Sequence, residues 1–123
     1  MVINVKIGIT GSRDFKNLQK VDIEMNQILS FLSDINEDCL IITGGAQGVD
    51  KAAIDYCLKY DVPYMTIRPI NPKDKYSYLF RNVEIVTMSD HIIAFWNGTS
   101  RGTKFTMDYA NERGKKVLVI RDD

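Results

Sequence analysis

The chain has 123 residues, of which 45% are hydrophobic and 26% are charged, the usual balance of a globular domain. Its 16 Lys and Arg residues are matched by 16 Asp and Glu residues, so no net positive field attracts nucleic acid or an anionic membrane. No stretch approaches the ~20 apolar residues of a membrane span, and the sequence opens without a secretory signal pattern. We therefore expect one cytoplasmic domain over residues 1–123, with nucleic acid an unlikely partner and no membrane association.

The two cysteines, Cys39 and Cys57, lie inside apolar stretches and lack the Cys-x-x-Cys spacing of a zinc or redox motif. Free cysteines in such surroundings are usually buried. The sequence thus predicts two reduced core thiols and indicates no metal site and no cofactor.

The first half of the sequence alternates short apolar runs with amphipathic segments. Residues 5–10 and 40–43 are apolar runs that end at glycine, which predicts buried strands of a parallel sheet. Between them, apolar residues recur at the spacing of a core-facing helix, at Leu18, Val21, Met25, Ile28, Leu29 and Leu32. A second helix is predicted over residues 49–60, and a third strand over residues 62–67.

The second half continues the alternation after a long loop. Two prolines exclude a helix over residues 68–75. A helix over residues 76–88 is predicted to lead into a strand over residues 91–96. A last helix begins near Gly102 and ends at Gly114, and a strand follows over residues 116–120.

This alternation predicts an α/β three-layer sandwich, in which a mostly parallel five-stranded sheet carries helices on both faces. In such sheets ligands bind at the carboxyl ends of the strands, near the point where the strand order reverses. Three candidate loops each follow a predicted strand, so we expect them to meet at this edge.

The first loop, Gly11-Ser12-Arg13-Asp14, brings a flexible glycine, a hydroxyl, a guanidinium and a carboxylate into one turn. Glycine allows backbone N–H groups to approach a phosphate, and the Arg13 fork matches phosphate oxygens. The alternative is a tight strand-to-helix turn with Asp14 or a neighbour as helix cap.

The second loop precedes a helix, an arrangement that directs N–H groups and the positive end of the helix dipole at an anion. Its sequence matches neither a G-x-G-x-x-G fingerprint nor a phosphate-binding G-x-x-x-x-G-K-[ST] loop. Asp50 is either a helix cap or an acceptor for ribose hydroxyls. The candidate binding residues here are Gly44, Gly45, Ala46, Gly48 and Asp50.

The third loop again combines glycines, hydroxyls and a guanidinium ahead of a helix. Its candidate binding residues are Asn97, Ser100, Arg101, Gly102 and Thr103. Each loop alone is explained by turn chemistry, but convergence of all three at one edge favours a shared ligand site.

Together with Arg81-Asn82, placed eight residues before Asp90, these motifs resemble the SLOG superfamily over nearly the whole chain. That superfamily embraces the DNA-processing protein DprA (Smf) and the LOG phosphoribohydrolases, and the small size resembles its stand-alone YspA-like branch. The resemblance implies a Rossmann-like fold that binds a nucleotide or a nucleotide-derived molecule, such as a nucleoside phosphate or ADP-ribose. LOG-like relatives are often dimers, so it also implies a possible homo-oligomer.

LOG enzymes remove the base from a nucleoside 5′-monophosphate with an arginine and a glutamate, and Arg81 matches that arginine. Gly102-Thr103 matches part of the second motif, Pro-Gly-Gly-x-Gly-Thr-x-x-Glu, but its glutamate position falls on Thr106. A threonine cannot act as a carboxylate base or stabilise an oxocarbenium ion. Asp108 or Asp50 would have to substitute.

The residues around Arg81-Asn82 and the segment 100–110 look closer to DprA, which binds single-stranded DNA. A strongly basic stripe with interleaved aromatics is missing from the sequence. The nearest patch is Lys73, Lys75, Tyr76 and Tyr78, which we interpret as a solvated loop or a lid.

We therefore expect a protein that senses or sequesters a nucleotide-like phosphate ligand. Its binding residues would be those of the three loops together with Arg81 and Asn82. The first alternative is an N-glycosidase or phosphoribohydrolase acting on a nucleoside monophosphate or an NAD-derived molecule, with Arg81 and Asp108 as catalysts. The second is a module that binds single-stranded DNA or another protein. Arg81 itself needs an anionic partner, for which phosphate, Asp50 or Asp90 would serve.

Overall fold

The computed structural model describes residues 4–123, and within this range strands and helices alternate along the whole chain. The elements are β1 (Val5–Gly11), α1 (Gln19–Asp34), β2 (Cys39–Thr43), α2 (Val49–Tyr60), β3 (Tyr64–Thr66), α3 (Lys75–Met88), β4 (His91–Trp96), α4 (Arg101–Glu112) and β5 (Lys116–Arg121).

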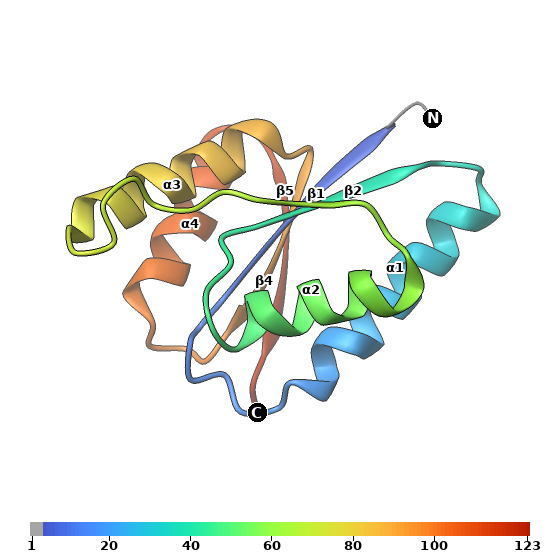
Figure 1. The fold of residues 1–123 in the computed structure, drawn as a ribbon, viewed down its shortest axis with the longest axis horizontal. Helices are drawn as coiled ribbons and strands as arrows, with labels where there is room; N and C mark the ends of the chain where they lie inside the picture. Colours follow the sequence, from blue (N-terminus) through green and yellow to red (C-terminus); the bar gives the residue numbers. More distant parts are fainter. Residues whose placement is uncertain (1–3) are drawn as a thin grey trace.

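All five of these strands are parallel and lie in the order β3-β2-β1-β4-β5. In the central strand, Gly8 pairs with Ile42 on one side and with Ile92 on the other. Helices α1 and α2 pack together on one face, and α3 and α4 pack together on the opposite face (Figure 1). The predicted α/β sandwich is therefore confirmed.

The core lies in two layers, because successive residues of a strand point to opposite faces of the sheet. Ile41 and Ile93 pack toward α1 and α2, whereas their neighbours Ile42 and Ile92 pack toward α3 and α4. All four side chains are almost completely buried. Strands buried on both faces explain why their sequences are continuous apolar runs.

The strand β3 is shorter than the sequence suggests, because the apolar run over residues 62–67 forms a strand only from Tyr64 to Thr66. The N–H of Val62 is still engaged in closing the end of α2, where it donates to the carbonyl of Cys57 (2.9 Å). As an edge strand, β3 pairs with β2 alone.

Cys39 and Cys57 are buried free thiols, as predicted. Burial raises the pKa of Cys39 to about 12 and that of Cys57 to about 11, so both remain protonated near neutral pH. They act as small apolar residues of the core.

The strand order reverses between β1 and β4, since the chain first builds outward from β1 to β3 and then crosses back to the other side of β1. The loops after β1 and β4 therefore diverge toward opposite faces and leave a crevice at the carboxyl edge. Within residues 4–123, no helix is long and apolar enough to cross a membrane.

Candidate ligand site at the carboxyl edge of the sheet

A cavity of about 590 Å³ lies above the carboxyl ends of β1 and β4, where the order of the strands reverses. Its volume is in the range of small-molecule sites. All three predicted loops and helix α3 contribute to its lining. The predicted site residues that line it are Gly11, Arg13, Ala46, Asp50, Arg81, Asn82, Asn97, Ser100, Gly102 and Thr103.

A second cavity of about 520 Å³ adjoins the first and shares part of its wall. Arg13, Ala46, Tyr78 and Arg81 line both cavities. Gly44 and Gly45 line only the second one, together with other residues of the β2–α2 loop and of the loop before α3. The structure thus brings the second loop to the site, but divides its residues between two adjoining spaces.

Four predicted site residues lie outside both cavities, and one of them, Ser12, is buried. Arg101 is exposed in the first turn of α4, and Gly48 is the residue directly before α2. Asp108 is exposed on α4 and pairs with Lys104 (2.9 Å), one helical turn away. The structure does not place a carboxylate of α4 at the cavity.

The position of the LOG glutamate is also closed to a ligand. Thr106 is fully buried, and its hydroxyl donates to the carbonyl of Gly102 (3.0 Å) within α4. Its side chain therefore serves the helix rather than the cavity.

Asp50, at the start of α2, is the buried carboxylate of the site, with 7% of its surface exposed. Its Oδ2 accepts the N–H of Ala46 (3.1 Å), whereas its Oδ1 has no hydrogen-bond partner within residues 4–123. Burial raises the pKa of Asp50 to about 6, although the N–H groups of Ala46 and Gly44 and the charges of Arg81 and Arg13 act in the opposite direction. Asp50 thus lines the cavity with a carboxylate of which one buried oxygen has no partner among residues 4–123.

Arg81 projects from α3 and is 93% buried, since 7% of its surface is exposed. It donates to the carbonyls of Gly44 (2.6 Å) and Ile67 (3.3 Å) and to the side-chain oxygen of Asn82 (2.9 Å). Burial lowers the pKa of its guanidinium, and the charge of Asp50 opposes this shift. Two backbone carbonyls and the Asn82 side chain are thus the direct partners of Arg81.

Asp90, one of the three alternatives for an anionic partner of Arg81, is engaged elsewhere. Its carboxylate accepts the N–H of Lys6 (2.8 Å), next to the amino end of the sheet. Asp90 lies there because it precedes β4, whereas the ligand loops follow the strands.

The ring of Tyr78 lies beside two guanidinium groups, with Arg13 at 5.2 Å and Arg81 at 5.4 Å from its centre. Its hydroxyl donates to the carbonyl of Pro72 (3.0 Å) in the loop before α3. Cation–π contacts of this kind hold the two charges near each other without neutralising them. Both charges remain available to an anion.

Two glycines permit the loops to approach one another. A Cβ at Gly44 would lie 2.3 Å from the guanidinium of Arg81, so only glycine leaves room for that side chain. Gly48 has a φ of +82°, and a Cβ there would lie 2.8 Å from the carbonyl oxygen of Arg13. The glycines of the second loop thus have packing roles beside any role in binding.

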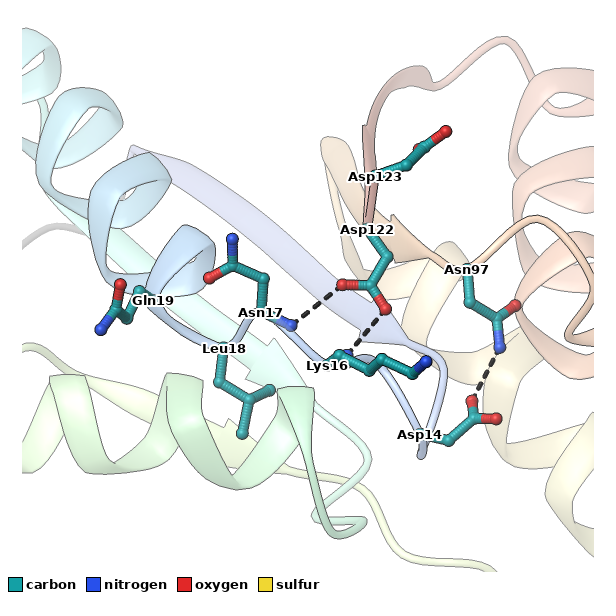
Figure 2. Close-up of a pocket in the computed structure, with 8 residues that line it drawn as sticks. All are labelled: Asp14, Lys16, Asn17, Leu18, Gln19, Asn97, Asp122 and Asp123. Atoms are coloured by element: carbon teal, nitrogen blue, oxygen red, sulfur yellow. Dashed lines mark hydrogen bonds between the residues drawn. The ribbon is translucent and has the colours of Figure 1, made fainter.

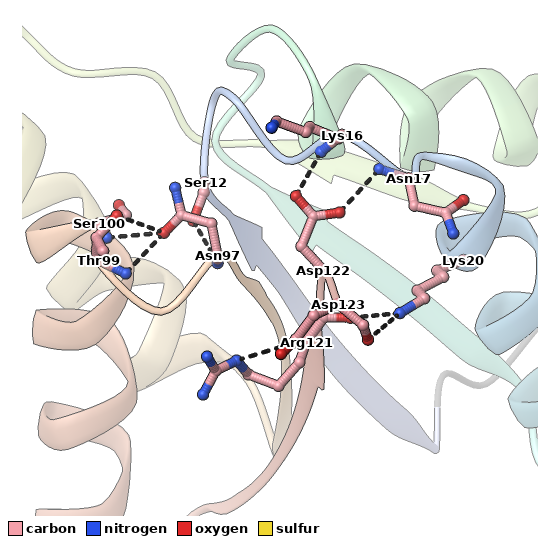
Figure 3. A network of polar contacts seen from close by, with 10 residues as sticks. All are labelled: Ser12, Lys16, Asn17, Lys20, Asn97, Thr99, Ser100, Arg121, Asp122 and Asp123. Atoms are coloured by element: carbon pink, nitrogen blue, oxygen red, sulfur yellow. Dashed lines mark hydrogen bonds and ion pairs between the residues drawn. The ribbon is translucent and has the colours of Figure 1, made fainter.

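The loops after β1 and β4 are tied together by Asn97 and Ser12. The Asn97 side chain donates to Asp14 (2.7 Å) and accepts the N–H groups of Thr99 (2.9 Å) and Ser100 (2.8 Å). The Asn97 N–H donates to the hydroxyl of Ser12 (3.1 Å), which is buried below the loops (Figure 3). Both residues therefore shape the cavity from one side.

Asp122, which follows β5, contacts the segment that leads from β1 to α1. The carboxylate of Asp122 accepts the N–H groups of Lys16 (2.7 Å) and Asn17 (2.9 Å), and these hydrogen bonds lower its pKa (Figure 3). A further cavity of about 870 Å³ lies at this junction, outside the loops, with Asp14 and Asn97 at its rim (Figure 2). Its wall is mostly formed by the start of α1 and the chain end.

Arg68 and Asp122 are the contributors that the sequence reasoning missed. Arg68 lines the second cavity and donates to the carbonyl of Gly45 (3.4 Å). It directly follows the apolar run of β3, so the rule that identified the other loops would also have found it. Asp122 has no comparable signal, because its partners are more than 100 residues away in the sequence.

No protein-family model and no curated protein matches the sequence. Solved structures do match the fold. DNA processing protein A (DprA) from Helicobacter pylori, described for its single-stranded DNA binding mode, superposes with a TM-score of 0.71 at 20% identity, covering 94% of this chain and 64% of that one. DprA from Streptococcus pneumoniae gives 0.69 at 19% identity, with coverages of 94% and 50%.

A third structure, the protein TM1055, gives a TM-score of 0.70 at 17% identity and covers 93% of this chain and 72% of that one. The chain spans 64% and 50% of the length of the two DprA chains. At these identities the comparisons establish the fold alone, which this chain shares with DprA and TM1055.

Proposed function

We propose that the cavity above β1 and β4 binds a nucleotide, with its phosphate toward Arg13 and its ribose toward Asp50. One observation carries this proposal, the unpartnered Oδ1 of the buried Asp50 in a wall that also holds Arg13 and Arg81. A buried acceptor left without a donor costs about 1–3 kcal/mol, so a ligand that supplies the donor gains affinity.

The pairing of charges decides what kind of ligand fits. A simple anion such as phosphate is attracted by Arg13 but repelled by the ionised Asp50, whereas a neutral sugar satisfies Asp50 but leaves the guanidinium unused. A nucleotide carries both an anion and hydroxyl donors a few bonds apart. The start of α4 also borders the cavity through Ser100, Gly102 and Thr103, where the helix dipole favours an anion.

Calorimetric titration with the four nucleoside 5′-monophosphates, with adenosine and with inorganic phosphate tests this proposal. We expect at least one monophosphate to bind more tightly than either adenosine or phosphate. The variant Arg13→Ala should bind that nucleotide about tenfold more weakly, the size of one charge-assisted contact.

Arg113→Ala is the matched control, because Arg113 is exposed and lies over a tyrosine ring, as Arg13 does, but at the far end of α4. Its affinity should equal that of the wild type. Absence of measurable binding for every nucleotide, with the protein folded, would refute the proposal.

Single-stranded DNA is the second candidate, and the likeness to Helicobacter pylori DprA favours it. This likeness also goes against the expectation, drawn from net charge, that nucleic acid is an unlikely partner. On α3, beside the site, Tyr76 and Phe80 are exposed to 58% and 70%, and the ammonium of Lys75 lies 5.5 Å from the Tyr76 ring centre. Exposed aromatics next to cations are the surfaces on which unpaired bases stack.

Fluorescence anisotropy with a labelled oligothymidylate, measured at two salt concentrations, separates the two candidates. Strand binding predicts an affinity that falls with salt and is reduced in Phe80→Ala. Binding that is insensitive to Phe80→Ala, or that is absent, would leave the mononucleotide site as the function.

Base release from a nucleotide is the remaining alternative and is followed by mass spectrometry in the same samples. Of the two carboxylates considered for this reaction, Asp108 lies outside the cavity and Asp50 lines it, so Asp50 is the one to test. Base release by the wild type that is lost in Asp50→Asn would show that the site is catalytic.

A further inference from the structure

The second cavity, beside the nucleotide site, has a composition that differs sharply from that of the first. Among residues 4–123, its lining includes Arg13, Arg68 and Arg81 and no acidic residue. The first cavity instead sets two arginines against Asp14 and Asp50. The first cavity thus has equal numbers of positive and negative side chains, whereas the second has positive ones only.

Three cations around one space repel each other unless an anion lies among them. Arg81 is fixed there by the carbonyls of Gly44 and Ile67, and Arg13 by the ring of Tyr78. None of the three makes an ion pair within the part of the chain that the structure describes. The nearby charge of Asp50 acts on Arg81 and Arg13 from the side of the first cavity, whereas the lining of the second cavity itself offers these cations no carboxylate.

The backbone of the second loop makes room for Arg68. Gly45 has a φ of +71°, and a Cβ at this position would lie 3.0 Å from the guanidinium carbon of Arg68 and 2.7 Å from a methyl of Thr66. Only glycine allows the Arg68 side chain to lie against the loop and donate to the Gly45 carbonyl. The guanidinium is thereby held at the mouth of the second cavity.

From this charge distribution we infer that the second cavity is a subsite for a second phosphate group, so that the ligand is a nucleoside diphosphate or a larger molecule built on one. The inference rests on the proposed nucleotide site. The shared wall of Arg13, Ala46, Tyr78 and Arg81 makes the two spaces contiguous, and a diphosphate extends from one to the other along this wall.

Arg68 separates the two subsites experimentally, because it lines only the second one. Titrations of AMP and ADP, without divalent cations, are compared in the wild type, Arg68→Ala and Arg13→Ala. In the wild type we expect ADP to bind about tenfold more tightly than AMP, since a second phosphate gains charge-assisted hydrogen bonds. In Arg68→Ala this gain should fall below about threefold, with the affinity for AMP nearly unchanged.

Arg13→Ala should weaken both ligands, because Arg13 faces both cavities, and Arg113→Ala should weaken neither. Equal affinities of AMP and ADP in the wild type, or an equal loss of both in Arg68→Ala, would overturn the second subsite while leaving the nucleotide site standing. Failure of AMP and ADP alike to bind would instead refute the nucleotide site.

A phosphodiester-linked dinucleotide, pApA, completes the experiment. Its second phosphate lies one nucleotide away rather than adjacent to the first. If only pApA gains affinity through Arg68, the subsite follows a nucleic-acid strand and the assignment to a diphosphate is wrong.

Discussion

The two halves of the carboxyl edge hold their loops in different ways. On the side of β2 and α3, two buried charged residues hold the second loop. Arg81 donates to the carbonyl of Gly44, and Asp50 accepts the N–H of Ala46. On the side of β4 and β5, Asn97 and Asp122 tie the loops together by hydrogen bonds that are largely open to solvent.

The difference matters because a polar contact is worth more where water cannot replace it. Losing an exposed hydrogen bond lets solvent satisfy the abandoned group, whereas losing a buried one leaves that group unpaired. We therefore expect substitutions in the buried half to change stability strongly, and substitutions in the solvated half to change it little. The following variants test this contrast in order of expected effect.

Arg81→Ala should have the largest effect, a loss of about 2–4 kcal/mol of unfolding free energy. The truncation leaves the carbonyls of Gly44 and Ile67 without their donor and opens a space in the wall of the cavity. Urea denaturation measures the change. Arg113→Ala, the exposed counterpart, should lie within about 0.5 kcal/mol of the wild type, and a similar value for Arg81→Ala would show that its burial is energetically unimportant.

Asp50→Asn should change the pH dependence of stability. The pKa of Asp50 is raised from 3.8 to about 6 in the folded state, so the native protein holds a proton that the unfolded chain releases between these values. Wild-type stability therefore falls as pH rises from about 4 to 6, by on the order of 1–3 kcal/mol.

The asparagine variant lacks this slope, so it should be more stable than the wild type at pH 8 and nearly equal to it at pH 4. Thermal unfolding across this range measures the difference between the two proteins. A constant difference at all pH values would contradict the raised pKa of Asp50.

Gly48→Ala should cost about 1–2 kcal/mol, because the new Cβ meets the carbonyl oxygen of Arg13 and the positive φ is unfavourable for alanine. Gly102→Ala is the matched control, since no atom lies within 4 Å of a Cβ there and alanine favours the helix. Denaturant melts should rank Gly48→Ala well below Gly102→Ala. The reverse ranking would show that the loops after β1 and β2 are not in close contact.

Asp122→Asn should have the smallest effect, and only the acid limb of the stability profile should show it. The hydrogen bonds from Lys16 and Asn17 lower the pKa of Asp122, so this contribution is present near neutral pH and is lost as pH falls. The variant should therefore lose less stability than the wild type on acidification. A large loss of unfolding free energy in Asp122→Asn at pH 7 would show that the hydrogen bonds of Asp122 contribute strongly to stability.

The fold and the edge at which the three loops meet could be predicted from the sequence, because both depend on periodic apolar patterns and on glycines that follow strands. Ile41 and Ile42 illustrate this: a continuous apolar run indicates burial on both faces, and the structure buries both side chains. The sequence could not assign the backbone partners of Arg81, which are the carbonyls of Gly44 and Ile67. Every residue has a backbone carbonyl, so no residue type marks these positions.

The exposure of Asp108 could also have been predicted from the helical spacing of α4. Thr103, Thr106, Met107 and Ala110 are the buried side of α4, and Asp108 lies on the other side, four residues after Lys104. Helical spacing alone therefore predicts an exposed i, i+4 ion pair rather than a catalytic carboxylate.

The central claim, that the crevice between β1 and β4 binds a nucleotide, is tested most directly by an amide ¹H–¹⁵N NMR titration with AMP and ADP. We expect saturable shifts concentrated at Gly11, Ala46, Asp50 and Thr103, with the amides of β5 near Leu118 unchanged. Shifts confined to the amino edge of the sheet, or none at millimolar nucleotide, would contradict it.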